Sequence, residues 1–310
     1  MILGIDTSNY TTSVALADGG GIGLDRRKPI AVGEGQRGIR QSEAFWQHVN
    51  CLPELLSGIE FSSLEAVCVS DAPRRQEGSY MPCFMAGVRF AEAVSSGEGI
   101  PLFRVSHQMG HIRAALEGAG GIDLSKPFLS VHLSGGTTEV LLTDYNGGDI
   151  SCGIVGGTSD LSAGQFIDRA GVALGIAFPA GSAMDEMFDE GADLRLPVSI
   201  RDGYVSFSGV ETKVQRMIAS GEYTPESVAS AVFRCVAQSV ASMICFASEA
   251  TGAESVLLAG GVSSSRNILG MIGSALPSGI KLYSASPGMG SDSACGVALL
   301  GYEYFSRLRR

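Results

Sequence analysis

The fold is decided by one stretch near the middle of the chain, which reads Phe128-Leu129-Ser130-Val131-His132-Leu133-Ser134-Gly135-Gly136-Thr137-Thr138-Glu139-Val140-Leu141-Leu142. An apolar strand runs into a tight polar turn, and a second apolar strand returns from it. The N-terminus repeats this pattern, with Ile2–Ser8 as the first strand and residues 11–16 as the returning strand. One such hairpin is common, whereas two about half a chain apart indicate an internal duplication.

The turns of both hairpins are rich in Ser, Thr, Asn and Gly. Short side chains and accessible backbone amides of this kind suit phosphate oxygens. Two ordinary β-hairpins without a ligand are the alternative interpretation.

Strands alternate with helices after each hairpin, which predicts an α/β fold with two lobes. We expect the first lobe at residues 1–122 and the second at 123–310, with the last helix packing back on the first lobe. Residues 179–213 are rich in Gly, Pro and Asp and are expected to form an elaborated loop. The expected helices are 42–56, 80–94, 162–174, 226–249, 264–274 and 293–305, and the expected strands are 66–70, 102–105, 255–258 and 281–283.

Composition narrows the class of protein. The chain has 310 residues, is 45% hydrophobic and carries a net charge of −10, so it can bury a large core but shows no basic face for gripping nucleic acid unaided. Its seven cysteines form no CxxC pair, which favours a reducing cytoplasm. The N-terminus reads as a strand rather than a signal peptide. Residues 228–247 are apolar but contain Arg234 and Gln238, so a buried helix is favoured over a membrane span.

A histidine pair is the first candidate for chemistry. His107 and His111 lie four residues apart, so on a helix both imidazoles share one face and could bind one metal ion. They follow an expected strand, at the sheet edge where α/β sites usually lie. Two ordinary histidines in a first helical turn are the alternative. Gln108 and Met109 stand between them, so the glutamate base of a zinc protease is missing.

An acidic residue could complete this site. Asp292, in Ser291-Asp292-Ser293-Ala294, opens the last expected helix, where capping that helix is its simplest role. Its carboxylate could instead bind the same metal ion as the two histidines. A set of two nitrogens and one oxygen holds iron or zinc and leaves positions open for phosphate or water.

Two further groups could contact a nucleotide. Gly260 and Gly261 end an apolar strand just before a helix cap, where a nucleotide can approach the backbone. Three aspartates, Asp160, Asp168 and Asp185, surround Pro179-Ala180-Gly181. Their carboxylates could accept hydrogen bonds from ribose hydroxyls. Buried strand ends and helix caps explain the same residues without a ligand.

These pieces, in this order, resemble the TsaD family, long labelled glycoprotease. The similarity runs from Ile5-Asp6-Thr7-Ser8 to Ser291-Asp292, and Phe207-Ser208-Gly209-Val210-Glu211-Thr212-Lys213 is similar to the family's Phe-Ser-Gly segment. The His-x-x-x-His, Ser-Gly-Gly and Phe-Ser-Gly motifs are specific only together. The resemblance implies a duplicated actin/Hsp70-like, ribonuclease H-like ATPase fold (ASKHA) with a cleft between two lobes. It also implies metal-dependent transfer of a threonylcarbamoyl group from threonylcarbamoyl-adenylate to N6 of adenosine in tRNA.

The resemblance assigns roles to individual residues. It implies one divalent iron or zinc ion on His107, His111 and Asp292, with ATP or an acyl-adenylate as ligand. No residue stands out as general base. tRNA would be held with TsaB-like and TsaE-like helper proteins, the chain would be a homo- or heterodimer, and no membrane is implied. The implied substrate residues are the phosphate-side loop His132, Leu133, Ser134, Gly135 and Gly136, the nucleoside contacts Asp168, Gly181 and Asp185, and Ser265 where the family usually has asparagine.

Departures from the family pattern suggest a divergent paralogue. Asp71-Ala72-Pro73-Arg74-Arg75-Gln76-Glu77 replaces a shorter Gly-Pro-Gly loop, and Asp160-Leu161-Ser162-Ala163-Gly164-Gln165 replaces Asp-Asp-Ala-Ala-Gly-Glu. Asn9-Tyr10-Thr11-Thr12 also differs from the usual acidic turn. One alternative is therefore a carbamoyltransferase or ATPase of the same fold with another substrate. A non-catalytic TsaB-like partner protein is the other, although such proteins lack the histidine pair.

Overall fold

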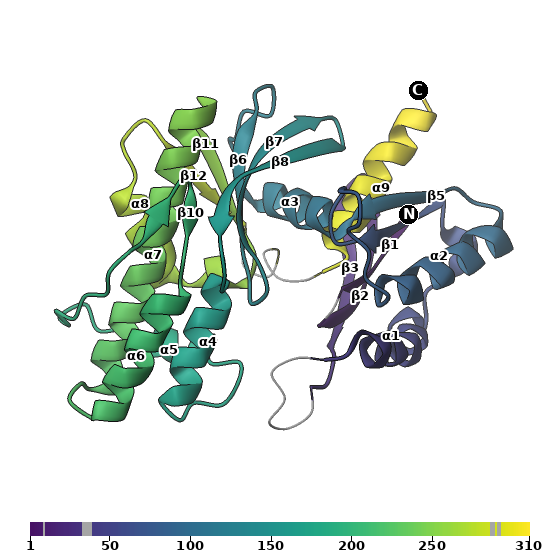
Figure 1. Ribbon diagram of the computed structural model, residues 1–310. Coiled ribbons are helices and arrows are strands. Elements are labelled where there is room, and N and C mark those ends of the chain that lie inside the picture. The colour runs from purple at the N-terminus through teal and green to yellow at the C-terminus, as the bar shows by residue number, and fades with distance from the viewer. Residues whose placement is uncertain (9, 33–38, 286–288, 290–292) are drawn as a thin grey trace. The chain divides into compact units, whose positions relative to one another are not determined.

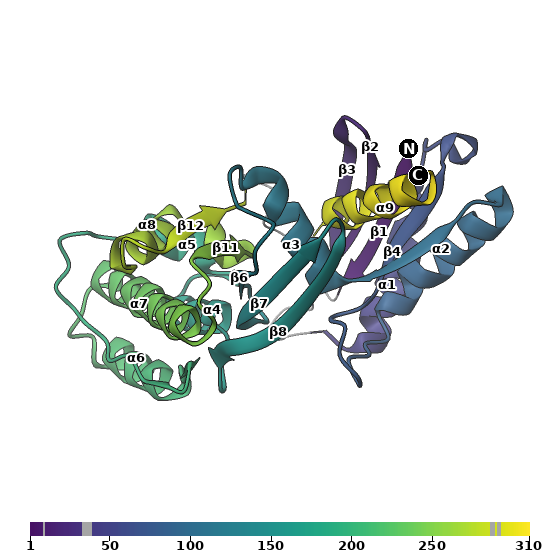
Figure 2. The same ribbon diagram turned by 90° about the horizontal axis from the view of Figure 1, so that it is seen from above.

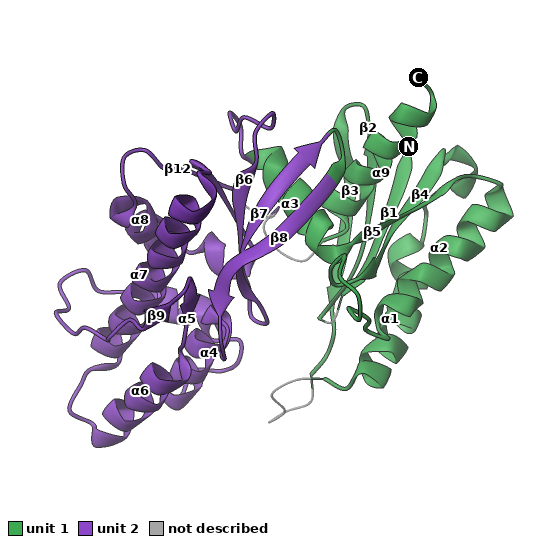
Figure 3. Ribbon diagram, turned by 45° about the horizontal axis from the view of Figure 1, so that its top comes forward, with its two compact units in different colours: residues 1–118, 147–149, 291–310 green, residues 119–146, 150–290 purple. Residues whose placement is uncertain are grey.

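The chain folds into two compact units. In a computed structural model the described residues are 1–8, 10–32, 39–285, 289 and 293–310. Unit 1 comprises Met1–Gly118, Gly147–Asp149 and Ser291–Arg310, and unit 2 comprises Ala119–Asn146 and Ile150–Gly290 (Figure 3). The C-terminal segment therefore belongs to the same unit as the N-terminus.

Unit 1 is built on a five-stranded sheet of order β3-β2-β1-β4-β5. β1, β2 and β3 form an antiparallel meander, and β4 and β5 continue the sheet in parallel. The elements are β1 (Ile2–Ser8), β2 (Thr11–Asp18), β3 (Gly21–Pro29), α1 (Gln41–Leu56), η1 (Phe61–Ser63), β4 (Ala66–Ala72), α2 (Phe84–Glu98), β5 (Leu102–Ser106), α3 (His107–Gly118) and α9 (Cys295–Leu308).

The alternating side chains of β1 separate the two helical layers of unit 1. Leu3 and Ile5 belong to a core cluster with residues of α1 and α2. Gly4 faces the other way, where an added Cβ would lie 2.6 Å from the backbone nitrogen of Ala298 in α9. Figures 1 and 2 show α9 lying along this sheet, and α3 packs beside it. β1 is therefore buried on both faces.

Unit 2 is built on a seven-stranded sheet of order β12-β11-β6-β7-β8-β10-β9. β6 and β7 are the antiparallel hairpin expected from the sequence, and β11 and β12 run parallel to β6. The elements are β6 (Phe128–Leu133), β7 (Thr138–Asn146), β8 (Asp149–Thr158), α4 (Ala163–Ala173), α5 (Gly181–Glu186), β9 (Ile200–Arg201), β10 (Tyr204–Val205), α6 (Ser208–Ser220), α7 (Pro225–Thr251), β11 (Ser255–Ala259), η2 (Gly261–Ser264), α8 (Arg266–Ala275) and β12 (Lys281–Ser284).

α7 is the central helix of the unit 2 core. Thr224 caps its first turn by accepting a hydrogen bond from the Ser227 backbone, and Gly252 ends it in a left-handed conformation. Among the described residues it is the one helix long and apolar enough to cross a membrane, and 78% of its most apolar window is buried inside the protein. That burial is what a core helix requires.

The region 179–213 corrects the expectation of an irregular loop. It contains α5, the short hairpin of β9 and β10, and the first turns of α6. α2 also begins later than expected, at Phe84 rather than residue 80. Pro82 explains this start, because a proline disfavours helical backbone at the residue before it. β3 and β8 extend the two hairpins and were not expected.

Candidate functional site

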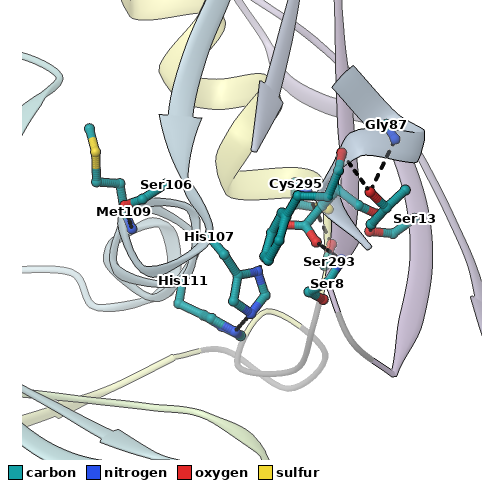
Figure 4. Close-up of polar contacts among 12 residues, drawn as sticks. Ser8, Ser13, Gly87, Ser106, His107, Met109, His111, Ser293 and Cys295 are labelled. Carbon is teal, nitrogen blue, oxygen red and sulfur yellow. Dashed lines mark hydrogen bonds and ion pairs between the residues drawn. The ribbon is translucent and has the colours of Figure 1, made fainter. Parts of the chain in front are cut away.

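The two histidines of α3 point toward one another (Figure 4). His107 begins the helix directly after β5, and one helical turn separates it from His111. Their Nε2 atoms lie 2.9 Å apart, and the rings meet edge to face. Met109 points away from both imidazoles. The expected helical spacing therefore places both ring nitrogens at one point.

Asp6 of β1 orients the first of these rings. Its Oδ2 lies 2.8 Å from Nδ1 of His107, and its Oδ1 accepts a hydrogen bond of 2.8 Å from the Ser8 backbone. The Asp6 side chain is 1% exposed and that of His107 is 16% exposed. The ring of Phe84 packs edge-on against His107. Contact with the carboxylate favours the proton on Nδ1, so that Nε2 of His107 presents its lone pair.

The donor set fits iron or zinc as far as the described residues reach. Two imidazole nitrogens converge, one of them is held from behind by a carboxylate, and His111 is 5% exposed. Within the described part of the chain, no group of three or more His, Cys, Asp or Glu side chains could hold a metal ion. Asp292, the expected third ligand, lies outside the described residues.

A separate cavity of about 250 Å³ lies in unit 2. Its polar wall combines glycine backbone with serine and aspartate side chains, and its apolar wall holds aliphatic and aromatic side chains. Neither Lys nor Arg is among the lining residues, so its side chains carry negative charge only. The lining residues are Gly135, Gly164, Ile167, Asp168, Pro179, Gly181, Ser182, Asp185, Phe233, Gly261, Val262, Ser264, Ser265 and Ile268.

Six residues expected at a nucleotide site share this cavity, namely Gly135, Asp168, Gly181, Asp185, Gly261 and Ser265. They come from α4, α5, η2, the β6–β7 turn and the residue before α8. Sequence reasoning did not single out Asn267, which contacts Asp185 from the first turn of α8. No motif marks it, because the two residues are 82 positions apart in the chain.

Asp168 holds the segment that enters α5. Its Oδ1 accepts a hydrogen bond of 2.8 Å from the Ala180 backbone. Burial raises the pKa of Asp168, opposed by backbone hydrogen bonds from Ala180 and Gly181. The carboxylate thus fixes the backbone of Gly181 while it lines the cavity.

The Ser-Gly-Gly turn is tied to the start of α4. Oγ of Ser134 accepts a hydrogen bond of 3.0 Å from the Thr137 backbone. Oγ of Ser162 donates to the Gly135 carbonyl at 2.8 Å and accepts from the Gln165 backbone at 3.1 Å. Ser162 and Gln165 also form a reciprocal capping box. Two departures from the family pattern therefore have a structural role, which is to cap α4 beside this turn.

The other expected ligand residues do not line the cavity. Leu133 is a fully buried core side chain, and His132 precedes it on β6. Gly260 has a φ of +98°, and a Cβ there would lie 2.3 Å from the Leu133 carbonyl oxygen. Gly260 is thus required for close packing of β11 on β6. Ser134 and Gly136 also lie outside the cavity lining.

The carboxylate of Asp160 contacts the residues that lead into α6, and Asp160 is not among the residues that line the cavity. Its carboxylate accepts hydrogen bonds from the Ser206 hydroxyl at 2.6 Å and the Phe207 backbone at 2.8 Å. Partial burial opposes ionisation of Asp160, but hydrogen bonds from Ser206, Ser208 and Phe207 outweigh it and lower the pKa. The structure supports the capping role, which was the simpler interpretation.

His48 is a buried histidine that the sequence did not mark. It is fully buried on α1, and its Nδ1 lies 2.8 Å from Oγ1 of Thr12. Burial lowers its pKa to about 4, opposed by the charge of Asp6. A neutral His48 therefore joins α1 to β2.

Comparison with known sequences identifies one family. A family model described as TsaD, tRNA N6-adenosine threonylcarbamoyltransferase, matches residues 49–297. A protein of that name from Nautilia profundicola is 30% identical over 244 residues, which cover 74% of this chain and 70% of its own. One from Thermus thermophilus is 28% identical over 323 residues, which cover 99% of this chain and 93% of its own.

Solved structures agree on the fold. Component A of (R)-2-hydroxyglutaryl-CoA dehydratase from Acidaminococcus fermentans is similar with a TM-score of 0.56 and 19% identity, covering 98% of both chains. HypF in its phosphate- and nucleotide-bound form gives a TM-score of 0.61 at 13% identity, covering all of this chain and 46% of that one. A ROK family glucokinase from Streptomyces griseus gives 0.53 at 14% identity, covering 97% of both. These likenesses confirm the actin/Hsp70-like ASKHA fold class.

Proposed function

Because the chain belongs to the TsaD family, we propose that it is an acyltransferase that carries a threonylcarbamoyl group from threonylcarbamoyl-adenylate to N6 of adenosine in tRNA. The family match and the names of its relatives support the transfer reaction. The observation that carries the proposal is that the Nε2 atoms of His107 and His111 lie 2.9 Å apart. The two imidazoles are thus already placed to bind one metal ion together.

His107 and His111 would hold a divalent iron or zinc ion, with Asp292 as the proposed third ligand. A bound ion of this kind supplies Lewis-acid stabilisation of negative charge on phosphate or carbonyl oxygen. Asp6 keeps the His107 ring in the orientation and protonation state that binding requires. No side chain is assigned as general base.

The unit 2 cavity would take the nucleoside of the adenylate. Apolar Ile167, Phe233 and Ile268 offer a surface for the base, and Asp168 and Asp185 offer acceptors for ribose hydroxyls. The absence of lining Lys and Arg suits a neutral nucleoside better than a phosphate. The phosphate would instead meet the backbone amides of the Ser134-Gly135-Gly136 turn, next to the N-terminus of α4.

A reconstituted transfer assay tests the proposal. Purified chain, tRNA, threonine, bicarbonate, ATP and candidate TsaB-like and TsaE-like partners are combined, and modified adenosine and protein-bound metal are both measured. We expect the His107→Ala/His111→Ala variant to lose metal and transfer together. Gln108→Ala, between the two histidines on α3, is the matched control and should keep both.

Each alternative predicts a different result. Full transfer by metal-free protein would refute the proposed role of the histidine pair. Bound nucleotide without modified adenosine would favour a carbamoyltransferase or ATPase with another substrate. A chain that binds neither metal nor nucleotide would be a non-catalytic partner protein. We further propose that the protein acts in the cytoplasm and holds tRNA together with helper proteins, as a homo- or heterodimer.

A further inference from the structure

Asp185 reaches the unit 2 cavity from the short helix α5, and two side chains of the α8 region hold it. The Ser265 hydroxyl donates to Oδ1 of Asp185 at 2.7 Å. The Asn267 amide donates to the same oxygen at 2.9 Å and to the Asp185 backbone carbonyl at 3.3 Å. One oxygen of the carboxylate is thus held by two donors.

The hydroxyl of Ser265 has its donor and an acceptor position in use. While it donates to Asp185, it accepts a hydrogen bond of 3.1 Å from the Ile268 backbone as the N-cap of α8. It has one hydrogen to donate, so it cannot also donate to a ligand. Ser265 was expected to contact a nucleoside, as the asparagine of the family would. While its hydroxyl donates to Asp185, it cannot make that contact by donating a hydrogen bond.

The second oxygen of Asp185 is different. Within the described residues, Oδ2 accepts no hydrogen bond, and Asp185 forms part of the cavity wall. A carboxylate oxygen is an acceptor only, so its ligand partner must be a donor. Because Ser265 and Asn267 fix the other oxygen, the direction of this acceptor is fixed as well.

We propose that Asn267 is a positioning residue which, with Ser265, holds Asp185 so that its second oxygen selects a ligand carrying a ribose hydroxyl. The inference rests on the proposed function for its nucleotide ligand. It assigns a role to a residue that touches Asp185 rather than the ligand. Asn267 acts through orientation, so its loss should reduce discrimination between ribose and deoxyribose more than it affects folding.

Binding of ADP, 2′-deoxy-ADP and 3′-deoxy-ADP to the full chain tests this inference by calorimetry. We expect the wild-type protein to bind ADP about tenfold more tightly than at least one deoxy analogue, as expected for one lost hydrogen bond to a charged group. Asn267→Ala should bind ADP about tenfold more weakly and discriminate less than about threefold. Its melting temperature should fall only modestly, because the loss of two hydrogen bonds to Asp185 is partly offset by the higher helix propensity of alanine.

Two further variants separate positioning from folding. Ser265→Thr keeps a hydroxyl and should retain the ribose preference, whereas Ser265→Ala should lose it together with some stability of α8. Ser274→Ala, on the same helix, removes an exposed hydroxyl that donates to the Gly270 carbonyl and should change neither property. An unchanged ribose preference in Asn267→Ala would overturn the inference.

The failure of the inference and that of the proposed function can be told apart. A wild-type chain that binds ADP with the expected preference but transfers no threonylcarbamoyl group contradicts the function alone. A wild-type chain that transfers the group while ADP and its deoxy analogues bind equally contradicts the inference alone. A chain that binds no ADP and transfers no threonylcarbamoyl group contradicts both.

Discussion

His48 makes the stability of the protein depend on pH below neutrality. Its pKa is lowered to about 4 by burial, whereas an unfolded histidine titrates near 6.5. Below pH 6.5 the unfolded chain binds a proton that the folded chain does not, so stability falls as the pH drops toward 4. At pH 5 this amounts to about 2 kcal/mol relative to pH 7.

Replacing His48 with glutamine should remove that component. Chemical denaturation of the wild-type protein and the His48→Gln variant at pH 7 and pH 5 gives the test. The variant is expected to be less stable at pH 7 because the contact with Thr12 is altered, but to lose about 2 kcal/mol less on acidification. Equal losses in both proteins would show that His48 is not the responsible group.

Asp6 is expected to control metal affinity without binding the ion. Asp6→Asn removes the charge behind His107 and should weaken binding of Zn²⁺ about tenfold to a hundredfold, measured by competition with a chelator. Asp18→Asn removes the same charge from the exposed end of β2 in unit 1 and serves as the control. Equal affinities in the two variants would contradict the role of Asp6.

At the scale of elements, α3 and α9 meet through a pair of glycines. A Cβ added to Gly296 would lie 1.8 Å from the Gly110 carbonyl oxygen. Gly296→Ala must therefore move one helix and should destabilise the protein by about 1–3 kcal/mol or more. Gly270→Ala is a matched helical change with open space around it, and should stabilise by up to about 1 kcal/mol. Thermal denaturation measures both, and an unchanged melting temperature in Gly296→Ala would refute the close crossing.

The elements that the sequence predicted are those whose residues carry a strong local signal. α1, α4 and α7 and strands β4, β5, β6, β7 and β11 coincide with the expected segments to within a few residues. α5 was missed because six residues are too few to show a helical period. β3 was missed because it contains Asp25-Arg26-Arg27-Lys28, whose charges fit an edge strand but not an apolar pattern.

The candidate sites could be predicted from the sequence only in part. The histidine pair follows from helical spacing, since four residues suffice to place both rings on one face. Among the six expected cavity residues, Gly261, Asp168 and Asp185 were marked by the sequence itself, and the resemblance to the family added Gly135, Gly181 and Ser265. Asp6 behind His107 and Asn267 behind Asp185 could not be predicted, because each acts on a residue far away in the chain, through contacts that only the folded units create.

At the scale of the whole molecule, the net charge of −10 limits how tightly the chain alone can bind tRNA. Binding to a polyanion depends on releasing counterions from phosphates by basic side chains. We expect the chain alone to bind tRNA more weakly than about 10 µM at physiological salt. A partner with a basic surface should raise the affinity at least about tenfold, with a steeper dependence on salt. Filter binding measures both, and submicromolar binding by the chain alone would contradict this expectation.

The position of α9 has a consequence for how the protein is made. The helix packs against β1, β2 and β4 within unit 1, but its codons follow those of the whole of unit 2. A ribosome therefore delivers everything needed for unit 2 while unit 1 still lacks one covering helix of its sheet. Domains generally fold as soon as their residues emerge. During synthesis unit 2 would thus finish folding first, although it begins later in the chain. The apolar surface around Gly4 would stay exposed until α9 is made, and would depend most on chaperones.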